Sequence, residues 1–454
     1  MHLFGFVLVT LISVSLTEDE LVLVTTLWRH GERNPRYTFR SDPYKENDWI
    51  GGYGALSKVG FANQIELGKR LRQEYINKHQ LFSSRTTNSL FDQAYFRSSD
   101  VNRNLISAQA NVFGFFGPSS VYDDVNGWPP GIQPFPIHTV PYETDRVLNP
   151  DASCQLYYDI WQTIVQSSFY EHFSQENMEI FNDIRSHTEE SLNSFDSWML
   201  YDSLHCMKTA NKSWPSWVTQ EKFLQLQRIN NLSENWRNGI GLQQLERTNN
   251  AASEHRFSVL IPRVRGGSLL WEIIDHMNTA VVCQTEKTKH AIRKRRCELK
   301  YFGYSAHDTT LMALLSTLET KTAVLGDSTP EYNDAIALEL WLSLENDFYI
   351  KAKYLNYRAN STVDFTEHIT NCSLFGAKCM LDTFVARSLP YKPPHEVDNW
   401  CKNGLWSYGR ESTDGDINRV DKGSFQSKTS LAYGTLNAVL LTIIILVLTY
   451  GDAS

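Results

Sequence analysis

The sequence predicts an α/β fold, in which an open mixed sheet is flanked by helices and carries an inserted, mainly helical lobe. The run LVLVTTLW at residues 21–28 is apolar and β-branched without alternation, which is typical of a strand buried on both faces of a sheet. A second strand, KYFGYSA at residues 300–306, is followed at once by a helical pattern. Residues 150–254 carry helical patterns rich in aromatic side chains and give no strand signal, so they predict the lobe.

The first part of the chain contains two strand–loop–helix units. The strand at 21–28 ends in RHGERNP at 29–35, where charge, glycine and proline mark the exit into a loop. A helical pattern follows Ser57, which stands at the cap position, and extends to Tyr75. A short strand, AYF at 94–96, precedes RSSD and a second helical pattern. Ligands of open α/β sheets bind at the carboxyl ends of the strands, so these loops are candidates for a site.

Strand character returns in the last third of the domain. The run RFSVLI at 256–261 predicts a strand, and 300–306 predicts another before HDTT and a helix. The runs at 335–344 and 347–355 alternate in polarity across a Glu-Asn turn and predict a β-hairpin.

The two ends of the chain predict targeting segments. Residues 1–17 form an apolar run before an acidic cluster and predict a signal peptide, with a buried first strand as the alternative. Residues 431–450 carry no charge and are long enough to span a bilayer. The tail that follows lacks lysine and arginine, so a lipid-anchor signal with small residues at Gly423 and Ser424 is the rival. We expect a single-pass type I membrane protein, or a lipid-anchored one, with a lumenal (lysosomal) or extracellular body.

The expected organisation is a signal peptide (1–17), a main domain (18–408), a juxtamembrane stalk (409–430) and the anchor (431–450). The main domain would consist of an α/β part (about 18–149 and 255–401) and the helical lobe (about 150–254).

Composition excludes some functions and predicts an oxidising compartment. A net charge of -8 argues against a general nucleic-acid partner. The seven cysteines predict three disulfides and one free thiol, and no pair has the CxxC spacing of a zinc or redox site. Sequons for N-glycosylation begin at Asn211, Asn231, Asn360 and Asn371. The basic run HAIRKRRC at 290–297 is similar to a nuclear signal or a nucleic-acid patch, and a lumenal location excludes the first. We interpret Arg293 to Arg296 as a solvated charged face that precedes a strand.

The densest chemical signal is the loop after the first strand. Arg29 and Arg33 flank His30, and guanidiniums match phosphate oxygens while a neutral imidazole is a nucleophile near mildly acidic pH. A surface loop rich in Arg and His is the plain alternative. The surface-loop alternative is disfavoured because Arg97 ends a second predicted strand and His307-Asp308 ends a third. Three strand ends with chemically active side chains are therefore expected to converge.

The same segments carry a family resemblance that covers nearly the whole lumenal chain. RHGERNP resembles the signature RHGxRxP of the histidine acid phosphatases, FRSSDVNR their arginine-bearing segment, and YSAHDTT their C-terminal HD signature. GALSKVGFANQIELGKRLR and HTVPYETD are similar to the branch with lysosomal and prostatic acid phosphatases. The resemblance implies the histidine phosphatase fold, which is phosphoglycerate mutase-like.

The resemblance also implies roles for individual residues. His30 would be the nucleophile and Asp308 the proton donor to the leaving alcohol. The phosphate oxygens would be bound by Arg29, Arg33, Arg97 and His307. No metal and no cofactor is expected, since these groups neutralise the charge themselves. The implied disulfides are Cys154–Cys401, Cys206–Cys297 and Cys372–Cys379, with Cys283 free.

The function predicted in this way is hydrolysis of small phosphate monoesters, and a homodimer is a candidate assembly. A phytase-like enzyme for inositol phosphates is the enzymatic alternative, and a catalytically silent, membrane-tethered binding protein is the alternative from another class. Plainer roles exist for single residues: Arg97 in a salt bridge, His307 as a core histidine, Asp308 as a helix cap.

Overall fold

The computed structural model describes residues 18–82, 90–117, 122–189, 197–285, 297–372 and 378–405. An eight-stranded sheet runs through it in the order β3-β2-β4-β1-β5-β6-β7, with β8 paired to β6. Its strands are β1 (Glu20–Arg29), β2 (Ala94–Ser98), β3 (Ile137–His138), β4 (Tyr301–Ala306), β5 (Ala335–Leu342), β6 (Phe348–Asn356), β7 (Ser361–Asp364) and β8 (Cys379–Met380). Pairs among β1 to β4 are parallel, and the pairs made by β5 to β8 are antiparallel. The predicted open mixed sheet is confirmed.

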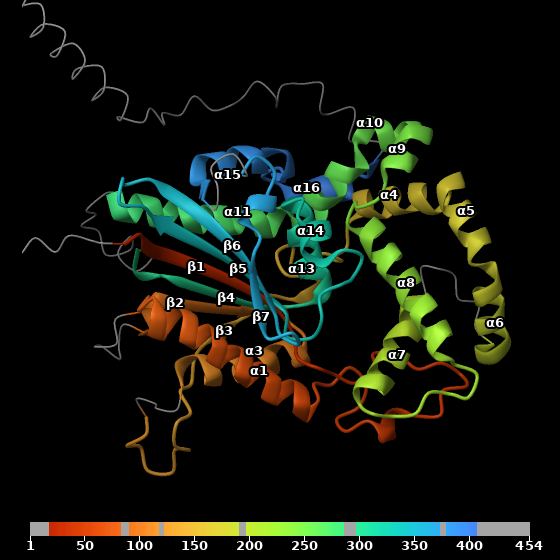
Figure 1. The fold of residues 1–454 in the computed structure, drawn as a ribbon, viewed down its shortest axis with the longest axis horizontal. Coiled ribbons are helices and arrows are strands. Elements are labelled where there is room, and N and C mark those ends of the chain that lie inside the picture. The colour runs from red at the N-terminus through yellow and green to blue at the C-terminus, as the bar shows by residue number, and fades with distance from the viewer. Residues whose placement is uncertain are drawn as a thin grey trace, which may run out of the picture. The chain divides into compact units, whose positions relative to one another are not determined.

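Helices cover both faces of the sheet (Figure 1). On one face lie α1 (Lys58–Leu71) and α3 (Asn102–Phe116), whose apolar side chains share a core with the strands. On the other face lie α11 (Phe257–Thr285), α13 (Asp308–Thr317) and α15 (Leu381–Ser388), which enclose a second core.

Strand β1 lies between β4 and β5, and every residue from 21 to 29 is buried. Leu23 and Leu27 point into the core beneath α11 and α13, whereas Val24 and Trp28 point into the core beneath α1 and α3. An apolar run without alternation is what this central position requires. The predicted strands at 94–96 and 300–306 and the hairpin formed by β5 and β6 are likewise confirmed.

Helix α1 begins as the sequence predicts. Ser57 is its N-cap, and its Oγ accepts a hydrogen bond of 2.9 Å from the amide of Gly60. The helix packs against α3 through Gly68, where an added Cβ would lie 2.1 Å from the carbonyl oxygen of Asn111. Glycine is therefore needed here for close approach of two helices.

Residues between α3 and β4 are mainly helical, and the described part of 150–254 contains no strand. The helices are α4 (Gln155–Val165), α5 (Ser168–Glu176), α6 (Met178–Thr188), α7 (Ser197–Thr209), α8 (Gln220–Arg237), α9 (Gln243–Thr248) and α10 (Asn250–His255). The remaining helical segments are α2 (Leu90–Gln93), α14 (Lys321–Leu325), α16 (Val397–Lys402), a π-helical turn at Arg72–Lys78, and 3-10 turns at Glu46–Asp48, Tyr142–Thr144, Thr366–His368 and Leu389–Tyr391.

The strand predicted at 256–261 is wrong, because these residues open helix α11. Phe257, Leu260 and Ile261 are buried at the spacing of one helical face, and the apolar pattern continues along the helix. A short apolar run looks the same in a buried strand and in a buried helix, so periodicity over six residues does not separate the two.

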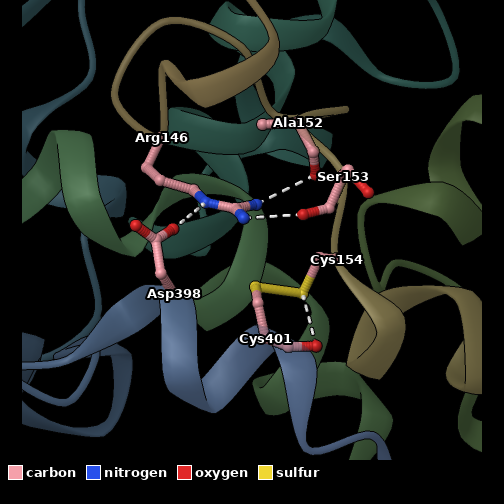
Figure 2. Close-up of a disulfide and its surroundings, with 6 residues drawn as sticks. All are labelled: Arg146, Ala152, Ser153, Cys154, Asp398 and Cys401. Atoms are coloured by element: carbon pink, nitrogen blue, oxygen red, sulfur yellow. Dashed lines mark hydrogen bonds and ion pairs between the residues drawn. A yellow bond between two sulfur atoms is a disulfide. The ribbon is translucent and has the colours of Figure 1, made fainter.

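One disulfide joins distant parts of the chain. Cys154, which precedes α4, pairs with Cys401 in α16, and Figure 2 shows this bond beside a cluster of polar contacts. There the guanidinium of Arg146 contacts Asp398 at 3.1 Å and donates to the carbonyl oxygens of Ala152 and Ser153. The Cys372–Cys379 bond is also present, so two of the three implied pairings are confirmed.

The third implied pairing, Cys206–Cys297, is wrong, and so is the free Cys283. Cys283, near the end of α11, pairs with Cys297, and Cys206 is a free, buried thiol. The Sγ of Cys206 lies 3.6 Å from Arg33 and 3.7 Å from the hydroxyl of Tyr332. Burial raises the pKa of this thiol to about 12, so it stays protonated.

Several predicted segments lie outside the described residues, namely the signal peptide at 1–17, the stalk at 409–430 and the anchor at 431–450; most of the basic run at 290–297 does too. Among the residues that the structure describes, we find no helix with the length and apolarity to cross a bilayer. Of the sequon asparagines, Asn211, Asn360 and Asn371 are exposed, whereas Asn231 is half-buried within α8. Their glycosylation stays a prediction.

Candidate active site

The carboxyl ends of two adjacent parallel strands place two histidines side by side. Arg29 is in register with Ala306 across β1 and β4, so the next residues, His30 and His307, leave the sheet together. The amide of His30 donates to the carbonyl oxygen of Ala306 at 3.0 Å, and the two imidazole rings are 5.6 Å apart, edge to face. The convergence predicted for these strand ends is therefore present in the structure.

His30 is set up as a neutral base with a free nitrogen. Its Nδ1 lies 2.8 Å from the carbonyl oxygen of Gly31, which only accepts, so Nδ1 carries the proton and Nε2 carries the lone pair. Burial, together with the guanidiniums of Arg103, Arg29 and Arg33, lowers the pKa of His30 well below its usual value. The imidazole therefore stays neutral, and nucleophilic at Nε2, into acidic solution.

Two of the predicted arginines are held by carboxylates. Arg29 contacts Asp308 at 2.8 Å and lies over the ring of Tyr332, while its Nη1 donates to the backbone. Arg33 binds Asp202 through both nitrogens of its fork, at 2.8 and 3.0 Å. Asp202 belongs to α7, so the helical region supplies the group that orients an arginine of the RHGERNP loop. Such bidentate pairs fix a guanidinium in one plane.

A third arginine, Arg103, was not among the predicted site residues. It lies in the first turn of α3, and its Nη2 is 3.5 Å from Nδ1 of His307. Burial, with the nearby charges of Arg33 and Arg36, lowers the pKa of Arg103 to about 9. The group remains a cation in acid, but no carboxylate among the described residues forms an ion pair with it. A half-buried guanidinium without a paired carboxylate, beside His307, is suited to an anionic ligand.

Arg97, which the family resemblance implies as a phosphate ligand, has other partners. Its guanidinium contacts Asp145 at 2.5 Å and Glu272 at 3.4 Å. Asp145 is fully buried and also accepts from the amides of Val147 and Leu148. Arg97 therefore forms a salt bridge on the α11 face of the sheet, which is the plainer role that the sequence left open, and Arg103 takes its place at the site.

His307 and Asp308 begin helix α13. Nε2 of His307 is 2.9 Å from the hydroxyl of Ser99, and since Nδ1 accepts from Arg103, Nε2 donates. Burial and the charges of Arg103 and Arg36 lower the pKa of His307 well below its usual value. The cap position of α13 belongs to His307, and Asp308 is the first helical residue, so the N-cap alternative for Asp308 is wrong.

Gly31, the glycine of the loop, allows two backbone segments to pack closely together. An added Cβ at Gly31 would lie 2.4 Å from the carbonyl oxygen of Gly60, and one at Gly60 would lie 2.1 Å from that of Glu32. The backbone of the loop therefore packs directly on the first turn of α1. The amide of Gly31 also donates to Ser107 of α3, at 3.1 Å.

A cavity of about 370 Å³ opens from this group of residues. Arg29, Arg33 and Asp308 are among its lining residues. Its other lining residues come largely from α7, α8 and the loops near β1 and β5, among them Arg36, Trp198, Tyr201, Glu234 and Glu331.

Fold and site together define the class: a mixed α/β protein with a neutral histidine among arginines, at the carboxyl ends of parallel strands. The chain belongs to the histidine phosphatase superfamily (branch 2), whose sequence model matches residues 20–372. The family suggested by the motifs is confirmed.

Named relatives agree with this assignment. The chain is 30% identical over 343 residues to prostatic acid phosphatase of Bos taurus, covering 74% of this chain and 78% of the relative. It is 28% identical to lysosomal acid phosphatase of Homo sapiens, covering 74% and 71%. The phytase from Citrobacter braakii matches with a TM-score of 0.58 at 15% identity, over 83% of this chain and 98% of that one. At this identity the phytase supports the fold alone.

Proposed function

We propose that the chain is an acid phosphatase, which hydrolyses phosphate monoesters through a phosphohistidine formed on His30. The observation that carries the proposal is the state of His30: Nδ1 is committed to the carbonyl of Gly31, so Nε2 presents its lone pair. The lowered pKa of His30 keeps that lone pair available in acid. The acid phosphatases among the relatives support the same activity.

In this mechanism the phosphate is bound by Arg29, Arg33, Arg103 and His307. The guanidiniums of Arg29 and Arg33 are each held in a fixed orientation by a carboxylate. Arg103 supplies a positive charge that forms no ion pair in the described part of the chain. Phosphoryl transfer needs positioning and dispersed positive charge, which fixed guanidiniums provide without reorganisation.

The reaction has two steps. Nε2 of His30 attacks phosphorus, the bond to the ester oxygen breaks, and Asp308 gives its proton to that oxygen, releasing the alcohol. Water then attacks the phosphohistidine, Asp308 takes its proton, the P–N bond breaks, and orthophosphate leaves with neutral His30 restored. Asp308 contacts Arg29 at 2.8 Å in the described state. A phosphate bound to Arg29 would compete for the guanidinium and free the carboxyl for this proton.

The location of the protein is part of the proposal. Three disulfides fit an oxidising compartment, and lysosomal and prostatic relatives fit a lumenal or extracellular domain. We infer that residues 1–17 direct secretion and that residues 431–450 attach the protein to a membrane, as a helix or as a lipid-anchor signal. Glycosylation at the exposed sequons and a homodimer belong to the same proposal.

The test is to trap the intermediate. The purified protein is incubated with a phosphorus-labelled aryl phosphate at acidic pH, quenched, and mapped for label. We expect label on His30, none in the His30→Ala variant, and normal labelling in the control His172→Ala, because His172 is an exposed histidine of α5. Label on another side chain, or turnover by the His30→Ala variant, would contradict the mechanism.

A further inference from the structure

The guanidinium of Arg36 is a charge in the cavity that the proposed mechanism does not use. Arg36 follows the RHGERNP loop and lines the same cavity as Arg29, Arg33 and Asp308. The inference below rests on the proposed phosphatase activity and concerns the part of the substrate that leaves.

The backbone on both sides of Arg36 is fixed. The carbonyl oxygen of Pro35 accepts from the amide of Gly54 at 2.8 Å, and that of Tyr37 accepts from the hydroxyl of Ser203 at 2.7 Å. The amide of Arg36 itself donates to Oδ2 of Asp202 at 3.1 Å. The side chain therefore starts from a backbone held by the loop and by α7.

Aromatic rings position the guanidinium. It lies 5.3 Å from the ring of Trp198 and 5.4 Å from that of Tyr37, and these two rings pack edge to face. Trp198 lines the cavity as well. Contacts of a cation with two ring faces favour one orientation over free rotation in solvent.

Among the described residues, no carboxylate forms an ion pair with Arg36. Asp202, which its amide contacts, is occupied by both nitrogens of the Arg33 fork. Two other carboxylates of the cavity have basic partners, since Asp151 contacts Arg265 at 2.7 Å and Glu234 lies 3.6 Å from Arg237.

We propose that Arg36 binds a second anionic group on the leaving part of the substrate, so that the enzyme prefers phosphomonoesters whose alcohol carries a carboxylate or another phosphate. His30 is buried, whereas Arg36 is exposed and lines the cavity together with Asp308, the proposed proton donor to the leaving oxygen. An alcohol whose oxygen takes its proton from Asp308 therefore lies in the cavity that Arg36 also lines. A planar guanidinium is well matched to carboxylate and phosphate oxygens.

The test uses two esters that differ in one group: glycerol 3-phosphate, and 3-phosphoglycerate, in which a carboxylate replaces the hydroxymethyl group. The quantity measured is the ratio of kcat/KM for 3-phosphoglycerate to that for glycerol 3-phosphate. We expect wild type to favour 3-phosphoglycerate, Arg36→Gln to lower the ratio about tenfold, and Arg36→Lys to restore part of it. Added salt should lower the wild-type ratio more than that of Arg36→Gln.

The matched control is Arg40→Gln, because Arg40 is exposed in the same loop and pairs with Glu189 outside the cavity. It should leave the ratio unchanged. An equal loss on both esters in Arg36→Gln would mean that Arg36 holds the transferred phosphoryl group, and an unchanged ratio would mean that it holds neither; both results overturn the inference. A wild-type protein inactive on both esters would instead contradict the proposed function.

Discussion

Replacing Arg103 and Arg97 separately by glutamine should have opposite consequences. Arg103 is half-buried and lies beside His307, and desolvation together with the charges of Arg33 and Arg36 lowers its pKa to about 9. Its charge therefore costs folding free energy until an anion binds. Arg103→Gln should lower kcat/KM for an aryl phosphate by roughly 100- to 1000-fold, as loss of one donor to a developing charge typically does. The free energy of unfolding should be unchanged or higher.

Arg97→Gln should behave in the reverse way. It leaves the fully buried carboxylate of Asp145 without its counter-ion, and breaking one side of a buried pair costs about 3–5 kcal/mol. The variant should be clearly less stable in urea unfolding, whereas the folded fraction should keep kcat/KM within about threefold of wild type, since Arg97 does not reach the site.

The free energy of unfolding and kcat/KM are measured on the same preparation of each variant. The kinetic assays contain no urea, so that the protein is folded. The reasoning fails if Arg97→Gln is stable but inactive, or if Arg103→Gln turns over normally. In either case Arg97 of β2, and not Arg103 of α3, would hold the phosphate.

Three further outcomes are expected. Because the pKa of His30 is lowered in the folded protein, the unfolded chain binds a proton below pH 6.5 that the folded chain does not. The free energy of unfolding therefore decreases as the pH is lowered through 6.5. His30→Gln should make the decrease between pH 8 and pH 5.5 smaller by about 1.4 kcal/mol, measured by urea unfolding. An equal loss in both proteins would show that His30 titrates normally. Gly60→Ala should destabilise the protein and lower kcat together, because its Cβ would meet the carbonyl of Glu32, and unaltered kinetics would contradict the tight packing of loop on helix. Peptide mapping without reduction should recover Cys283 linked to Cys297, and a peptide linking Cys206 to Cys297 would refute the described pairing.

Much of the fold follows from local patterns in the sequence. The central strand β1 and its neighbour β4 were predicted because a strand buried on both faces needs an unbroken apolar run, and because charge and glycine end it sharply. The ends of these two strands also predicted that His30 and His307 lie close together, because both residues directly follow their strands. The run that opens α11 was misread because six residues hold less than two helical turns.

The burial pattern of β2 explains why Arg97 forms a salt bridge and does not bind phosphate. In β2, Ala94, Phe96 and Ser98 are buried, whereas Arg97 and Tyr95 alternate with them. Alternation places Arg97 on a face of the sheet and not at its end, so the signal for a salt bridge was present. Arg103 lies at a helix start after the loop, which is also where anions bind.

Other features of the site had no local signal. Asp202 comes from α7, 169 residues from the arginine that it orients, and nothing in its surroundings marks it. The partner of a cysteine is equally a matter of tertiary distance: Cys283 and Cys297 meet with a Cα–Cα distance of 5.3 Å, while Cys206 is enclosed beside Arg33.

The Cys154–Cys401 bond also determines what a protease can do to this protein. The bond joins two cysteines that are 247 positions apart, and the loop it closes contains α7, α11, β4 and Asp308. A single cut anywhere within that loop leaves both fragments covalently attached, so a nicked molecule keeps its two halves together until a reductant acts. One cut between residues 154 and 401 would therefore not by itself separate His30 from Asp308.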